Sequence, residues 1–162
     1  MPSTRQAPLY RAAFDLVAAR ACGEHALFAA VLRELREDFG DLCAVGTFAV
    51  AHAALRLVCA TSGSTGAQVL ARVVVNDVPA ARDVAADVLA VLARAGDDLA
   101  AACEAARLLG RGPRAEDAMV VFTDVALALV TRTAALAGVG VPAVSQHLRE
   151  QVESSLAGDL AA

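Results

Sequence analysis

Residues 42–60 read LCAVGTFAVAHAALRLVCA, a stretch in which apolar or small residues occupy nearly every face of a predicted helix. A helix that is apolar all round has no solvent-facing side, so it is typical of a protein interior or of a membrane. Gly40 and Asp41 precede the stretch as a helix stop and an N-cap. The stretch therefore predicts a central helix, around which the rest of the chain packs.

Residues 118–136, AMVVFTDVALALVTRTAAL, repeat this all-apolar character and predict a second central helix. Uncharged runs near these stretches, such as 42–55 and 133–148, reach only 14 to 16 residues. That is shorter than the roughly 18 residues that indicate a membrane span. We therefore expect no membrane span and interpret both stretches as buried core helices.

Glycine, proline and acidic cap residues divide the rest of the chain into further helical segments, one of which starts at 76–79. Several are amphipathic; in 24–39, for example, apolar residues recur at helical spacing. About a quarter of the 162 residues are alanine, the best helix former, and the length suits one domain. The sequence predicts an all-α, single-domain bundle of seven to eight helices over residues 8–157, with a flexible 1–7 and a frayed 158–162.

The order of amphipathic and all-apolar segments occurs twice, with the second copy displaced by roughly 74 to 78 positions. This displacement indicates two pseudo-repeated four-helix halves. Four pairs of identical residues then correspond: Phe48 with Phe122, Gln68 with Gln146, Leu70 with Leu148 and Val74 with Val152.

Composition and charge argue against several classes of function. The net charge is −4 and the arginines are scattered, so no basic patch points to nucleic acid. Cys22, Cys43, Cys59 and Cys103 lack metal or redox spacing and are interpreted as buried apolar residues. No metal site or cofactor is predicted, because no histidine joins the acidic groups on the helices.

The start of the chain and its choice of basic residue bear on origin and location. The first residues show no secretory signal, so we expect a cytoplasmic protein. The chain has no lysine, which indicates a GC-rich bacterial coding sequence.

Four residues of the central helices are candidates for a site. Asp124 lies in an apolar helix and needs a partner there, and Arg56 of the other central helix is the natural choice. Phe48, His52 and Arg56 follow one another at intervals of four residues, so they share a helix face that can line a pocket. His25 and His147 lie among polar neighbours and are expected to face solvent.

Three functions remain open at this point. The first is a non-enzymatic module that associates with itself, as a dimer, or with a protein partner through leftover apolar helix faces. The second is a protein that binds a small apolar ligand between the central helices, near Phe48, His52, Arg56 and Asp124. The third is a helical enzyme, whose site would form only where titratable groups meet in three dimensions.

Overall fold

The computed structural model describes residues 6–73 and 82–161, and this part of the chain is all-α without a strand. The predicted helical bundle is thus confirmed. Seven helices have thirteen residues or more and an eighth, α4, has five. In chain order the elements are α1 (Gln6–Ala21), α2 (His25–Phe39), the 3₁₀ turn η1 (Gly40–Leu42), α3 (Cys43–Ser62), α4 (Gly66–Leu70), α5 (Arg82–Ala95), α6 (Leu99–Arg111), α7 (Ala115–Ala137) and α8 (Val141–Ala161).

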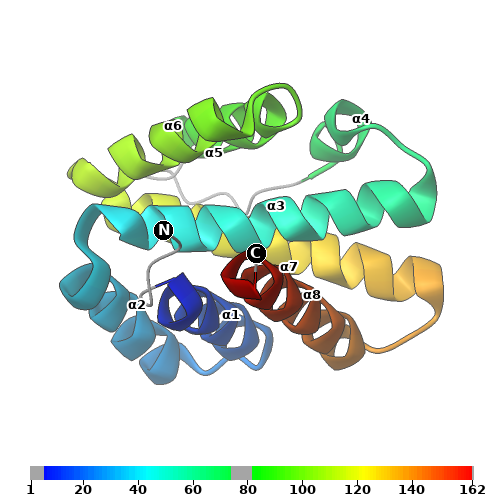
Figure 1. Cartoon of the computed structure of the whole chain (residues 1–162), viewed down its shortest axis with the longest axis horizontal. Coiled ribbons are helices and arrows are strands. Elements are labelled where there is room, and N and C mark those ends of the chain that lie inside the picture. Colours follow the sequence, from blue (N-terminus) through cyan, green and yellow to red (C-terminus); the bar gives the residue numbers. More distant parts are fainter. Residues whose placement is uncertain (1–5, 74–81, 162) are drawn as a thin grey trace.

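The two predicted central helices are α3 and α7, which cross the middle of the molecule in the same direction (Figure 1). In Figure 1 the α1–α2 hairpin and α8 lie on one side of this pair, while the α5–α6 hairpin and α4 lie on the other. Phe48 and Phe122 are both fully buried where the two helices meet, and their rings pack edge to face with centroids 5.9 Å apart. Such aromatic pairs add to the stability gained from burial alone.

Three threonines bring hydroxyl groups into this apolar interior: Thr47, Thr123 and Thr133. Each hydroxyl donates to a backbone carbonyl one helical turn earlier, at 3.0, 2.7 and 3.0 Å respectively. A buried hydroxyl without a partner would be destabilising, so these bonds explain how polar residues are accommodated in the core.

The ends of both central helices are set by glycine. Gly63 follows α3 and Gly138 follows α7, with φ values of 69° and 67°, in the left-handed region that favours glycine. α3 begins at Cys43 and α7 at Ala115, within three residues of the starts predicted from the sequence. The helix start expected at 76–79, and residues 1–5 and 162, lie outside the described residues. α1 begins at Gln6 and α8 extends to Ala161.

The contacts between helices agree with two similar halves. The hairpin α1–α2 corresponds to the hairpin α5–α6, and the pair α3–α4 corresponds to the pair α7–α8. The contact of α1 with α8 corresponds in the same way to the contact of α5 with α4. Among the described residues, one helix contact has no counterpart: α8 packs on α3, whereas α4 does not pack on α7. The corresponding residues Leu70 and Leu148 are both buried, and Val74 lies outside the described residues.

Two helical stretches, 25–62 and Ala115–Ala137, are long and apolar enough to cross a membrane by length and composition. In each case 56% of the apolar window is buried inside the protein, as it is in the core helices of many soluble proteins. The two stretches are therefore weak evidence for a membrane span.

The turn η1 is fixed to the end of α6 by ion pairs. Arg111 Nε and Arg107 Nη1 donate to the same carboxylate oxygen of Asp41, at 2.8 and 3.2 Å. The bond from Arg111, supported by both positive charges, holds the pKa of Asp41 below its usual 3.8. The close approach of α6 to η1 is possible because residue 110 is glycine, whose missing side chain leaves room for the backbone carbonyl of Asp41.

Replacement of Gly110 by alanine is predicted to destabilise the fold by about 1 to 3 kcal/mol, because the added methyl group would overlap the backbone carbonyl of Asp41. Gly66→Ala is the matched control. At Gly66 the nearest heavy atom to the new methyl would be Leu55 Cδ2 at 3.9 Å, which is an ordinary van der Waals contact. Urea unfolding of both variants measures the difference. Equal losses of stability would contradict the proposed backbone contact.

Candidate binding groove

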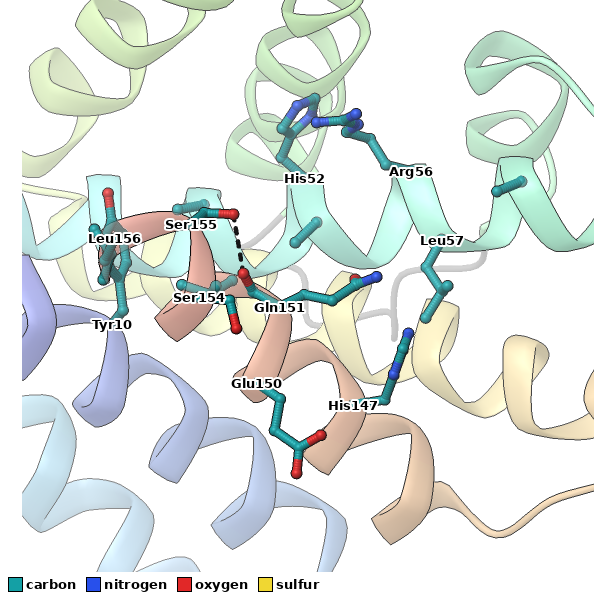
Figure 2. A pocket seen from close by; sticks show the side chains of 14 residues that line it. Tyr10, His52, Arg56, Leu57, His147, Glu150, Gln151, Ser154, Ser155 and Leu156 are labelled. Atoms are coloured by element: carbon teal, nitrogen blue, oxygen red, sulfur yellow. Dashed lines mark hydrogen bonds between the residues drawn. The ribbon is translucent and has the colours of Figure 1, made fainter. Parts of the chain in front are cut away.

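A groove of about 780 Å³ runs along the outer face of α3, between that helix and α8, with one end at α1 (Figure 2). Its floor is formed by small residues of α3, because Ala49, Ala53 and Ala60 place only a methyl group on this face. The groove is lined by Tyr10, Ala49, His52, Ala53, Arg56, Leu57, Ala60, His147, Glu150, Gln151, Val152, Ser154, Ser155 and Leu156.

The wall opposite α3 is the helix α8, which packs by one apolar stripe. Val144 and Leu148 of this stripe are buried, and Val152 and Leu156 are half-buried. The neighbouring face of α8 carries Gln151 and the exposed serines, so polar groups line the outer rim of the groove. The groove is therefore apolar at its floor and polar at its rim.

Contacts between α1 and α8 keep this wall in place. Arg149 donates to Asp15 at 3.1 Å, and its guanidinium lies over the ring of Phe14, 5.6 Å from the centroid. Arg11 approaches Glu153 at 3.6 Å one turn further along. Exposed ion pairs contribute little stability individually, so their main effect here is to fix the position of α8.

His52 lies at the edge of the groove, stacked on the buried ring of Phe48 with centroids 5.8 Å apart and planes inclined by 16°. Its Nδ1 atom is buried and has no hydrogen-bond partner among the described residues. Burial, and then the positive charge of Arg56, lower the pKa of His52 below its usual 6.5. His52 is therefore neutral at pH 7.

Arg56 lies one turn after His52 and is exposed. Figure 2 shows its guanidinium beside the His52 ring. Within residues 6–73 and 82–161, no carboxylate lies within ion-pair distance of Arg56. The groove thus has a pair of nitrogen-bearing side chains at one edge.

Of the four predicted site residues, the structure brings two into this groove, His52 and Arg56. Phe48 is buried against Phe122 and fills the space between the central helices, so the groove opens beside α8 instead. Asp124 does not line the groove. Positions 122 and 124 point in directions about 200° apart on a helix, so Asp124 faces away from α3 when Phe122 faces it.

The predicted pairing of Asp124 with Arg56 is wrong, because Asp124 pairs with Arg20 of α1. Arg20 Nε and Nη2 donate to the two carboxylate oxygens of Asp124, at 2.8 and 3.2 Å. The Asp124 side chain is 14% exposed, and the Arg20 guanidinium also lies over the ring of Phe28 at 5.2 Å. This two-pronged bond joins α1 to α7 and has a structural role.

The remaining sequence predictions concern the exposure of two histidines, the burial of the cysteines and metal binding. His25 and His147 are exposed, as predicted. Cys43 is buried and Cys59 and Cys103 are half-buried, but Cys22 is exposed, so its predicted burial is wrong; it lies in the turn after α1, where no helix covers it. In the part of the chain that the structure describes, no three His, Cys, Asp or Glu side chains meet as a metal site would require.

No pattern in the sequence predicts the contribution of α1 and α8 to the groove. Tyr10 and Gln151 come from helices that are far apart in the chain, and neither belongs to a recognisable motif. Burial, and then the nearby Cys103, raise the pKa of Tyr10 above its usual 10.0, so its hydroxyl stays protonated at pH 7.

The Arg20–Asp124 pair gives a prediction for a double-mutant cycle. Asp124→Asn and Arg20→Met are each expected to destabilise the fold by about 1 to 3 kcal/mol, since each leaves a half-buried polar group without its charged partner. The double variant should lose less than the sum. In the control, Asp124→Asn is combined with Arg56→Met, and the effects of these two changes should add. Urea unfolding measures the three single and the two double variants. A coupling found with Arg56 and not with Arg20 would refute the pairing.

Burial of neutral His52 predicts a dependence of stability on pH. Since its pKa is lower in the folded than in the unfolded chain, the unfolded chain binds more protons below pH 6.5. The free energy of unfolding should therefore fall as pH falls from 7 through the folded pKa, by about 1.4 kcal/mol per unit of pKa difference. His52→Gln should lose this part of the pH dependence and exposed His147→Gln should keep it. Identical curves of both variants against pH would contradict the prediction.

Comparison with known proteins assigns no family. Neither family models, nor curated proteins, nor solved structures give a match to this chain. The groove is consequently interpreted from its own residues, by their size, burial and charge.

Proposed function

We propose that this chain is a non-enzymatic binding module whose groove between α1, α3 and α8 takes a small molecule. The observation that carries the proposal is a groove of about 780 Å³ with an apolar floor and a polar rim. Ligand sites are usually hollows of about 300 to 1,000 Å³ that combine an apolar lining with a few polar groups. The alanine floor on α3 supports the proposal, because it provides depth without opening the core.

A second hollow, of about 500 Å³, lies between α2 and α7 and suits a small molecule less well than the groove does. Its lining is mainly charged, and the guanidinium of Arg36 already donates to Glu116 at 3.1 Å. Little apolar surface is left there for a ligand to cover.

The arrangement of titratable groups in the groove argues against catalysis. Figure 2 shows Tyr10 and His147 at opposite ends of the groove and Glu150 pointing away from α3. The side chain beside His52 is Arg56, which cannot act as the carboxylate that orients a catalytic histidine. The described groove residues thus offer binding groups but no nucleophile paired with a base.

Self-association, the first function predicted from the sequence, finds less support in the surface. The exposed large apolar side chains of the described residues are Leu27, Leu42, Leu99, Leu108, Leu136 and Val139, and they come from several elements. An interface between subunits would need such residues to form one large patch. Dimerisation, a protein partner and a cytoplasmic location stay predictions.

The proposal is tested with Nile red, an uncharged dye whose fluorescence rises in apolar surroundings. Wild-type protein is expected to bind the dye in a saturable one-to-one complex. Ala53→Phe fills the floor of the groove and should weaken binding at least tenfold. Ala128→Phe, the same change at an exposed position of α7, is the matched control and should bind as wild type does.

Circular dichroism checks that both variants are folded, and sedimentation velocity gives the number of subunits. Equal dye affinity in all three proteins would rule the groove out as the binding site. Dye binding that disappears on dilution, together with dissociation of a dimer, would favour the self-association hypothesis instead.

A further inference from the structure

We infer that the ligand of this groove is a medium-chain carboxylic acid, with its carboxylate on Arg56 and on Nε2–H of His52, and its alkyl chain along the alanine floor. The inference rests on the proposed function, since it names the class of molecule that the groove would take. Charge, hydrogen bonding and length each support it.

The charge argument begins with Arg56. Its guanidinium is always positive and presents donors in a fork that matches the two oxygens of a carboxylate. It lines the groove beside His52, on the side of α3 that Figure 2 shows turned away from α8, and the alanines of the floor lie on the same helix. A ligand with one negative end and an apolar body can satisfy both features, whereas a wholly apolar ligand would leave the arginine facing solvent.

The hydrogen-bonding argument concerns the two nitrogens of His52. A neutral imidazole has one N–H donor and one acceptor nitrogen. Because Nδ1 is buried without a partner among the described residues, a proton on that atom would leave a donor unsatisfied. With the proton on Nε2 instead, His52 is a donor, as Arg56 is, and the unprotonated Nδ1 is the nitrogen that stays buried. Two adjacent donors call for an acceptor such as a carboxylate.

The remaining charged group of the lining does not oppose an anion there. Glu150 accepts a hydrogen bond from Gln146 at 2.9 Å on the exposed side of α8, and Figure 2 shows its carboxylate directed away from α3. The other end of the groove carries uncharged residues, among them Tyr10, Val152 and Leu156. The positive charge and the apolar surface therefore lie at different places along the groove.

The length argument uses the geometry of α3. From Arg56 back to Ala49 is seven residues, or about 10 Å at 1.5 Å per residue. Small and aliphatic side chains border this part of the groove, and it ends near Tyr10 and Leu156. A saturated chain of about eight carbons has this length, so octanoate is the appropriate test ligand.

The experiment compares octanoate with octanamide, which has the same shape but no charge, in competition with Nile red and by NMR titration of the intact protein. In wild type, octanoate is expected to bind at least tenfold more tightly than octanamide. Arg56→Gln should reduce this preference to less than threefold by weakening octanoate alone. Arg94→Gln, which removes an exposed arginine outside the groove, should keep the full preference. Added NaCl should weaken octanoate and leave octanamide unchanged.

The possible outcomes distinguish a failure of the carboxylate assignment from a failure of the proposed function. Equal affinities for the two ligands, or a preference that survives Arg56→Gln, would overturn the carboxylate assignment. So would Nile red binding that neither ligand displaces, since the groove would then bind molecules of another class. Failure of Nile red itself to bind in the groove would remove the proposed function, and the inference with it.

Discussion

The contact between α3 and α7 at Phe48 and Phe122 is the constraint on which the rest of the structure depends. Both helices are apolar on nearly every face, so neither can be stable unless other helices keep water away from most of its surface. The two hairpins, α1–α2 and α5–α6, cover opposite sides of the pair (Figure 1). The remaining helices complete this cover, and the groove lies on α3 beside one of them, α8.

The location of the groove follows from a difference between the two similar halves. α8 has twenty-one residues, whereas α4, its counterpart, has five. The longer helix reaches across to α3 and forms a wall beside it, while α4 does not contact α7. Among the described residues, α3 is therefore the one central helix that the last helix of the opposite half contacts. The groove is a consequence of this unequal length, and a symmetric bundle would not have placed it on α3 alone.

The sequence predicted the central helices well because their pattern needs no knowledge of the partner: an all-apolar segment must be buried wherever it lies. It failed for Asp124, because its partner depends on which side of α7 faces α1, and Arg20 shows no distinguishing pattern in the sequence. The predicted pocket-lining face of α3 was correct for His52 and Arg56 and wrong for Phe48. Residues four apart on a helix drift by about 40° per step, so Phe48 stays in the core, His52 reaches its edge and Arg56 is outside. α1 and α8 reach the groove only through the tertiary fold, so no local pattern in the sequence predicts that they line it.

Alanine has opposite effects on the two sides of α3, and this explains how a tightly packed bundle can also have a groove on its surface. Where alanines are buried in the core, as Ala51 and Ala54 are, the short side chain lets the helices approach and leaves no space. Where alanines face outward, as Ala49 and Ala53 do, the same short side chain leaves a hollow between the taller neighbours. Composition predicts neither outcome, because each depends on which face α8 covers. Under the proposed function, the polar side chains at the edge of the hollow would select its ligand, and Arg56 supplies the positive charge there.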